Sequence, residues 1–298
     1  MSGREEGTRG SFKNIAMLMA IPLFGMAVFF LWQWWNGGIT PEQAYDEVRQ
    51  TTTHKSVSPQ SKPAVIEQDA LPKVTRKSRT HRGDIVLIID DLGFEGQPID
   101  RLMSLDPNIN CAILPNGTHA AEHARKLHAR GFEILVHLPM QPQGKEAPGR
   151  NAILTSMGDE EIAQLTRENI EAIPYARGVN NHMGSLATSD RRVMTSVLKN
   201  IPQSMYFIDS RTSGSSIAGQ LAREMNVRTA TRQVFLDDVA TTTAVRKQLR
   251  DLADLAERRG TAVGIGHPYA VTMRVLTEEV PALRAQGFRF VRASSVVR

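Results

Sequence analysis

The sequence contains a single cysteine, Cys111, among 298 residues. One cysteine allows no intramolecular disulfide and no zinc site built from thiolates, so we expect no disulfide partner, and any metal must be held by histidine and carboxylate side chains. Aromatic residues are also scarce, at 6% of the chain, and no internal repeat or low-complexity tract is visible. With 41% hydrophobic and 22% charged residues the composition is nevertheless that of a globular protein. This composition excludes wholesale disorder and a collagen-like repeat.

The main body of the chain also lacks an excess of charge of one sign. The formal net charge is +5, but residues 84–298 carry 25 basic and 24 acidic side chains. Most of the excess comes from five basic residues between positions 73 and 82. Such a run predicts a solvated linker, with contact to anionic lipid headgroups as the alternative. Because no basic surface interleaved with aromatic residues is present, we expect no binding to nucleic acid.

One long hydrophobic run stands near the start of the chain. Residues 15–35 read IAMLMAIPLFGMAVFFLWQWW, 21 residues without a charge, with all three tryptophans at the far end. A helix of this length crosses a hydrocarbon core of about 30 Å, and tryptophan is typical of the membrane interface. A cleaved signal peptide is the alternative, but its apolar region is usually only about 7–15 residues long and ends at a small-residue cleavage site. We therefore predict a transmembrane anchor.

The flanking charges predict how this anchor is oriented. Three basic residues precede the run, whereas Arg49 and Lys55 are the first two that follow it. Because basic residues accumulate on the cytoplasmic side, we expect residues 1–14 in the cytoplasm and the main body in the periplasm, on a single-pass protein of the inner membrane. Residues 36–83 are rich in Thr, Ser, Gln, Lys and Pro, which predicts a flexible linker that tethers the body to the membrane.

From residue 84 onward, short apolar runs alternate with segments of helical period. The candidate strands are 85–89, 111–114, 133–138, 204–208, 234–236, 261–266 and 288–291, and the clearest helices between them are 160–173, 215–225 and 243–259. This alternation over residues 84–298 predicts one α/β domain with a parallel sheet. The sheet is either open and doubly wound or closed into a (β/α) barrel.

Polar residues follow nearly every predicted strand. In folds of this class ligands bind at the carboxyl ends of the strands. Taken singly, a strand-end aspartate usually caps a helix and a histidine usually has a structural role. These residues would instead gather at one edge of the sheet, which predicts a common site. They are Asp90, Asp91, His137, Asn180, Asn181, His182, Asp209, Arg211, Asp237, Asp238 and His267.

Three of these residues suit a metal ion. One aspartate and two histidines on a rigid edge fit Zn²⁺ or a similar divalent cation with a position left open for water, and we predict Asp91, His137 and His182 as the ligands. Asp90 leaves its strand beside Asp91 but in a different direction. It is therefore the predicted base that accepts the proton of the attacking water.

The other strand-end residues complete a hydrolytic reaction. His267 is the remaining strand-end histidine and is predicted to protonate a departing amine, while Asp237 holds its imidazole and favours the protonated form. Asn181, Arg211 and Asp209 remain to bind and orient a polar substrate.

Taken in order, six segments resemble a known family. They are IIDDLG, HLPMQP, GVNNHMGS, DSRTS, FLDD and IGHPY, spread over residues 84–298. This set resembles the divergent polysaccharide deacetylase family (YibQ-like), a branch of the NodB-like carbohydrate esterases. The resemblance implies a distorted (β/α) barrel of NodB-like type, a divalent metal, and hydrolysis of N-acetyl groups on peptidoglycan or another envelope polysaccharide. It also implies that Asp90 is the base, Asp91 a metal ligand and His267 the acid.

The sequence departs from that family at two points. Typical polysaccharide deacetylases carry two metal histidines four residues apart, but the residue four positions after His137 is Gln141. His182 therefore takes the place of the second histidine by position, not by motif. The usual Arg-x-Pro-Tyr segment is not recognisable.

Three functional hypotheses follow. The first is a membrane-anchored, metal-dependent hydrolase that removes N-acetyl groups from an envelope polysaccharide. The second is a catalytically degenerate protein that binds glycan or acts as a scaffold in the cell envelope. The third is a glycosidase that pairs Asp90 or Asp91 with Asp237 or Asp238 and needs no metal.

Overall fold

The computed structural model describes residues 81–298. The predicted cytoplasmic segment, the predicted transmembrane helix and nearly all of the predicted linker lie outside the described residues. Within residues 81–298, no helix combines the length and hydrophobicity needed to cross a membrane.

The described residues form an α/β domain around a parallel sheet, as predicted. The strands follow the order β6-β5-β4-β3-β2-β1-β8-β7, every pair of neighbours is parallel, and β9 pairs with the start of β1. Their bounds are Gly83–Leu92 (β1), Asn110–Ile113 (β2), Glu133–Met140 (β3), Ala176–Met183 (β4), Tyr206–Asp209 (β5), Thr229–Thr231 (β6), Val234–Phe235 (β7), Thr261–Gly266 (β8) and Phe288–Phe290 (β9).

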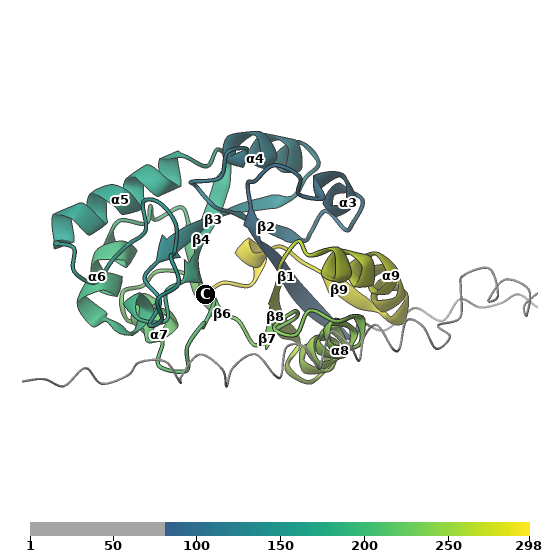
Figure 1. The fold of residues 1–298 in the computed structure, drawn as a ribbon. Helices are drawn as coiled ribbons and strands as arrows, with labels where there is room; N and C mark the ends of the chain where they lie inside the picture. Colours follow the sequence, from purple (N-terminus) through teal and green to yellow (C-terminus); the bar gives the residue numbers. More distant parts are fainter. Residues whose placement is uncertain (1–80) are drawn as a thin grey trace, which may run out of the picture. The chain divides into compact units, whose positions relative to one another are not determined.

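The sheet curls on itself without closing (Figure 1). Its two edges, β6 and β7, are consecutive in the chain and separated only by Arg232 and Gln233, yet each pairs only with its own inner neighbour. The sheet is therefore a half barrel with its edges linked by the chain. Of the predicted distorted barrel, the α/β class and the curled parallel sheet are present, whereas a hydrogen-bonded ring is not formed by the described strands.

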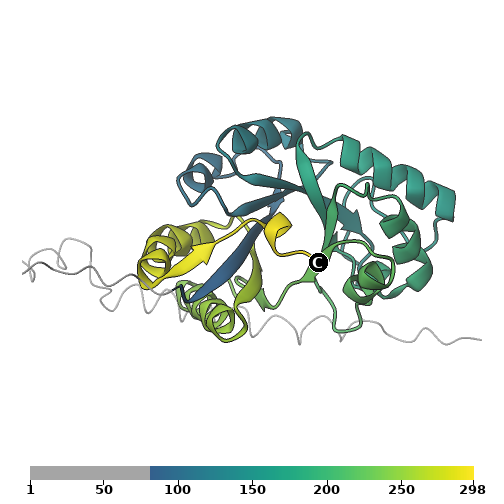
Figure 2. The ribbon, with the colours of Figure 1, turned by 180° about the vertical axis from the view of Figure 1, so that it is seen from behind.

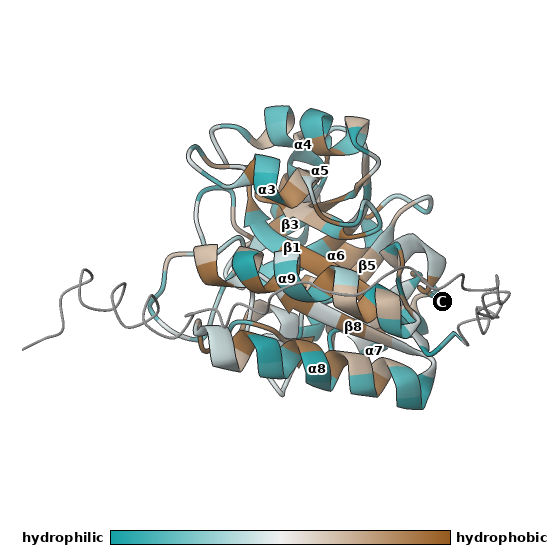
Figure 3. Cartoon of the chain, turned by 90° about the vertical axis from the view of Figure 1, so that its right-hand side faces the viewer, coloured by the Kyte–Doolittle hydropathy of each residue, from teal (hydrophilic) through white to brown (hydrophobic). Residues whose placement is uncertain are grey.

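Helices cover the outside of the curled sheet (Figures 1 and 2). They are Ile99–Met103 (α3), Ala120–Ala129 (α4), Asp159–Glu171 (α5), Arg191–Lys199 (α6), Ala218–Glu224 (α7), Thr242–Arg259 (α8) and Ala270–Gln286 (α9), with 3-10 turns at Ala187–Ser189 and Ala293–Ser295. Figure 3 shows the strands as largely hydrophobic and the helices as striped with hydrophilic residues. This pattern is typical of helices that bury one side against a sheet.

The two sides of each strand face different surroundings, because successive side chains alternate across a sheet. In β1, Ile85, Leu87 and Ile89 pack in the core with the helices, whereas Val86 and Ile88 belong to a smaller apolar cluster inside the curl. That inner cluster also contains Ala293 near the chain end. The middle of the half barrel is therefore filled by apolar side chains, whereas Asn110 and Glu133 at the start of β2 and β3 are buried polar residues that bond to Ala293 and Ser294.

Candidate metal centre

The inner face of the strands turns polar at their carboxyl ends. Two residues beyond Ile88 in β1 lies Asp90, two beyond Leu135 in β3 lies His137, and two beyond Ile265 in β8 lies His267. The same period of two places these side chains on the inner face, above the apolar filling. Alternation along the strands thus brings polar side chains from distant segments of the chain together at one end of the half barrel.

Asp91 reaches the same polar end of the half barrel through a local distortion of β1. Regular alternation would turn it away from Asp90, but the pairing of β1 with β2 shifts register between Ile89 and Leu92. Asp91 also has a φ of 58°, in the left-handed region that non-glycine residues rarely adopt. Such a bulge redirects a side chain, and strained backbone of this kind is concentrated at functional sites. Both neighbouring carboxylates therefore face the interior.

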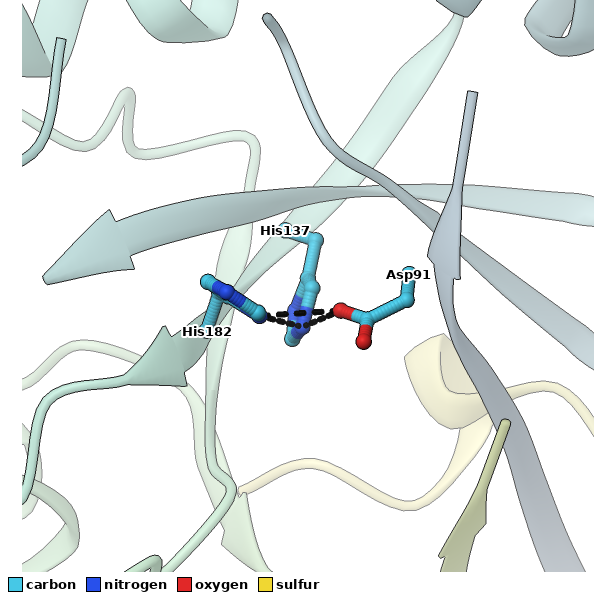
Figure 4. A group of neighbouring side chains, drawn as sticks. All are labelled: Asp91, His137 and His182. Carbon is cyan, nitrogen blue, oxygen red and sulfur yellow. Dashed lines mark hydrogen bonds and ion pairs between the residues drawn. The ribbon is translucent and has the colours of Figure 1, made fainter. Parts of the chain in front are cut away.

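Asp91, His137 and His182 converge on one point (Figure 4). Oδ1 of Asp91 lies 3.1 Å from Nε2 of His137 and 2.9 Å from Nδ1 of His182, and the two ring nitrogens are 3.1 Å apart. The three atoms form a nearly equilateral triangle. Ligands around a tetrahedral zinc ion, each about 2.1 Å from the metal, are about 3.4 Å apart.

The environment of these atoms also fits a cation. Oδ1 of Asp91 is buried and has no hydrogen-bond partner, although a ring nitrogen of His137 and one of His182 lie near it. A buried carboxylate oxygen without a donor is costly unless a cation balances it. The opposite nitrogen of His137, Nδ1, lies 2.9 Å from Oδ1 of Asn180 and must donate to it, which leaves the lone pair of Nε2 directed at the centre. The predicted Asp-His-His group is therefore present and suits a divalent metal ion.

Burial and the neighbouring charges shift the pKa values of the groups at this site. Burial raises the pKa of Asp90, which is 3% exposed. Burial alone would lower the pKa of His137, but the Asp90 and Asp91 carboxylates outweigh it and raise that pKa to about 9. Burial likewise favours a high pKa for Asp91, yet the imidazoles of His137 and His182 hold it well below its usual range. These directions show that positive charge is favoured at this point, and a metal ion that binds here would compete with protons for the same groups.

His267 and Asp237 form a second pair beside this group. Nδ1 of His267 lies 2.9 Å from Oδ1 of Asp237, whose other oxygen accepts from the backbone N–H of His267 at 2.6 Å and from the hydroxyl of Thr272 at 2.7 Å. Burial lowers the pKa of His267, but the contact with Asp237 more than compensates and the pKa is raised. Nε2 of His267 is left facing Asp91 Oδ2 at 3.7 Å.

The site opens into a pocket of about 430 Å³. Asp90, Asp91, His137, His182 and His267 all line it. Of the residues predicted to bind substrate, Asn181 also lines the pocket, with its amide held by Ser210 N and Met183 O.

The other two predicted substrate residues do not line this pocket. Asp209 follows Ile208 by one position, so alternation turns it toward the helices, where it accepts from Ser216 Oγ and from the backbone N–H of Gly219 at the start of α7. Arg211 lies on the surface with a φ of 46° and donates its backbone N–H to Asp209. Through these hydrogen bonds both residues contribute to the connection between β5 and α7.

Several pocket residues were missed by the sequence reasoning. Arg232, in the link between β6 and β7, packs its guanidinium over Phe235 at 4.8 Å and donates to the backbone oxygens of Ser210 and Arg211. Glu146 lines the pocket from the loop after β3. No motif marks either residue, and their place in the pocket follows only from the fold. Gln141, at the spacing where a second histidine is usual, instead accepts from Thr155.

An Asp-His-His group at the carboxyl edge of a curled parallel α/β sheet is suited to hold a divalent metal ion. Residues 87–297 match the family model described as divergent polysaccharide deacetylase. The chain belongs to this family, which confirms the resemblance seen in the sequence.

Similar proteins are found in several bacteria. The chain is 37% identical to the uncharacterised protein YibQ of Escherichia coli over 216 residues, covering 72% of this chain and 67% of YibQ. It is 32% identical to an uncharacterised protein of Haemophilus influenzae, covering 64% of this chain and 69% of that protein. Among solved structures, the uncharacterised protein ATU2773 of Agrobacterium tumefaciens has the same fold, with a TM-score of 0.70 and 20% identity over 74% of this chain and 91% of that one.

Proposed function

We propose that this protein is a metal-dependent hydrolase that removes N-acetyl groups from an envelope polysaccharide. The observation that carries the proposal is the convergence of three groups in one pocket: the Asp91, His137 and His182 triangle, the carboxylate of Asp90, and the imidazole of His267. Membership of the divergent polysaccharide deacetylase family supports an acetylated glycan as the substrate.

Asp91, His137 and His182 would hold the ion. When bound, a divalent cation would supply Lewis-acid activation of water and of the substrate carbonyl. Zn²⁺ suits this mixed set of one oxygen and two nitrogen ligands.

Asp90 acts as the general base. One of its oxygens accepts a hydrogen bond from Asn180 at 2.9 Å, while the other, Oδ2, faces the centre 3.6 Å from His137 Nε2. Oδ2 takes a proton from water as the water oxygen bonds to the amide carbon. The raised pKa of Asp90, caused by burial, makes its carboxylate a stronger base than an exposed aspartate.

His267 acts as the general acid. Asp237 fixes its Nδ1 side, so that Nε2 presents a proton to the pocket. When the C–N bond breaks, the departing nitrogen takes this proton. The products are acetate and a free amine on the sugar. The contact with Asp237 raises the pKa of His267, which favours the protonated ring that this role requires.

Acetate release tests the proposal. The full-length protein, purified in detergent, is stripped with a chelator, reloaded with Zn²⁺ and incubated with N-acetylated oligosaccharides and with peptidoglycan. We expect acetate only after reloading, and a loss of about 10²–10⁴-fold for Asp90→Asn and for His267→Ala, as is typical of acid and base residues. Asp254→Asn and His128→Ala, both exposed on distant helices, serve as matched controls and retain the activity.

The outcomes separate the three hypotheses. Zinc binding without acetate release from any of these glycans would contradict the enzyme and support a glycan-binding scaffold. Cleavage of glycosidic bonds that persists in chelator would support a glycosidase. Of the two carboxylates predicted to pair with Asp90 or Asp91 in such a mechanism, Asp237 already accepts three hydrogen bonds, whereas Asp238 lines the pocket and is the one free to serve.

We further propose that residues 15–35 anchor the protein in the inner membrane with the domain in the periplasm. The uncharged 21-residue run and the basic residues before it support this topology. Alkaline phosphatase fused after residue 83 should be active, because that enzyme folds only after export. An inactive fusion would place the domain in the cytoplasm.

A further inference from the structure

Asn180 is a fully buried side chain that links the two halves of the proposed site. It lies on the inner face of β4, two residues before His182, and is 0% exposed. Its carboxamide oxygen is 2.9 Å from Nδ1 of the ligand candidate His137. Its amide nitrogen donates to Oδ1 of Asp90 at 2.9 Å and to the hydroxyl of Ser210 at 3.2 Å.

The orientation of this amide is fixed by its partners. A carboxylate such as Asp90 can only accept, so the nitrogen of Asn180 must face it. The oxygen must then face His137, which has to carry its proton on Nδ1. In the neutral ring that a metal ion requires, the lone pair of His137 is consequently on Nε2, the atom directed at Asp91 and His182.

Asn180 therefore acts in two directions. On one side it fixes the tautomer and the ring orientation of His137, which prepares a ligand for the metal ion. On the other side it occupies Oδ1 of Asp90 and leaves only Oδ2 turned toward the centre.

We propose that Asn180 is a positioning residue that couples metal binding to the orientation of the general base, through the acceptor and the donor of one carboxamide. The inference rests on the proposed function, which assigns His137 as a metal ligand and Asp90 as the general base. It predicts that the acceptor and the donor can be separated by mutation.

Two substitutions make the separation. Asn180→Leu has a similar size and removes both hydrogen bonds. Asn180→Asp keeps an acceptor for His137 but sets a second carboxylate oxygen against Asp90. The matched control is Asn181→Asp, the same chemical change at the next residue of β4, whose amide bonds to the backbone of Ser210 and Met183 instead.

The first readout is the affinity of the full-length protein for Zn²⁺ alone, measured by competition with a chromogenic chelator. We expect Asn180→Leu to weaken zinc binding by about 10–100-fold, the usual effect of removing an outer hydrogen-bond partner of a ligating histidine. Asn180→Asp should bind zinc within about threefold of the wild type, or more tightly, because the support of His137 survives. Equal affinity for wild type and Asn180→Leu would overturn the acceptor half of the proposal.

The second readout is the melting temperature in the presence of chelator. Asn180→Asp should lower it, because two buried carboxylates then face each other. Adding Asp90→Asn should recover roughly half of the loss or more, since the exchanged pair restores a donor and an acceptor across the same contact. Asp90→Asn should not rescue Asn181→Asp. Simple addition of the effects of Asn180→Asp and Asp90→Asn would overturn the donor half.

Neither readout needs a glycan. Failure of the zinc and melting patterns therefore contradicts the role of Asn180 even if acetate is released. Conversely, intact patterns without acetate release contradict the proposed activity and leave the coupling in place.

Discussion

Replacing Asp237 should measure how strongly the β8–α9 connection depends on one buried carboxylate. The side chain of Asp237 is 0% exposed and accepts from the His267 backbone N–H, the His267 ring and the Thr272 hydroxyl. Asp237→Ala leaves all three donors without this partner. The His267 ring is 14% exposed and can turn to water, so two donors bear the main cost.

A buried donor left unsatisfied costs about 1–3 kcal/mol. Two such donors give a loss of about 3 kcal/mol for Asp237→Ala. For a domain of this size the loss corresponds to a fall in melting temperature of about 6–12 °C. Asp237→Asn preserves the shape and one acceptor, and about half of that fall is expected.

Thermal unfolding of the full-length protein is best followed by circular dichroism, because all three tryptophans lie at positions 32–35, outside the domain. The control is Asp238→Ala, which removes the same charge from the next, exposed residue and should change stability by no more than about 0.5 kcal/mol. If Asp237→Ala melts within 2 °C of Asp238→Ala, on the scale set by roughly 2–4 °C per kcal/mol, the three hydrogen bonds do not stabilise this connection.

Three further substitutions test other parts of the structure. His137→Ala and His182→Ala should each weaken zinc binding by more than about 100-fold in a chelator competition, because a site of three protein ligands loses much of its affinity when any one ligand is removed. The control is His123→Ala, which replaces a buried histidine on α4 and should leave zinc affinity unchanged. Unchanged affinity in His137→Ala or His182→Ala would show that the replaced residue is not a ligand. Gly178→Ala would place a Cβ 2.3 Å from the buried ring of Tyr206 on β5, an overpacking that costs about 1–3 kcal/mol; a melting temperature equal to that of the wild type would show that the ring can yield.

The sequence predicts the apolar strands well because burial on both faces leaves a continuous hydrophobic run. The expected strands at 85–89, 133–138 and 261–266 correspond to β1, β3 and β8. In contrast, β4 was not predicted as a strand. The inner face of β4 carries Gly178, Asn180 and His182. Because these residues are not hydrophobic, the strand lacks the continuous apolar run by which the other strands were predicted.

Alternation along the strands explains which site residues could be predicted. His137 and His267 lie two positions after inward apolar residues, and they reach the pocket. The same rule turns Asp209 outward, so its position could have been predicted from Ile208. Asp91 departs from this alternation because of its positive φ and the bulge in β1. No sequence pattern predicts these two features. The sequence also indicated no role for Asn180, because its role depends on the contacts with His137 and Asp90, which only the fold brings together.

Anomalous diffraction from crystals grown with zinc will show whether Asp91, His137 and His182 share one cation. We expect a single strong zinc peak about 2.0–2.2 Å from Oδ1 of Asp91, Nε2 of His137 and Nδ1 of His182. A pocket without a peak, or a zinc ion held by other residues, would mean that these three side chains do not form a metal site.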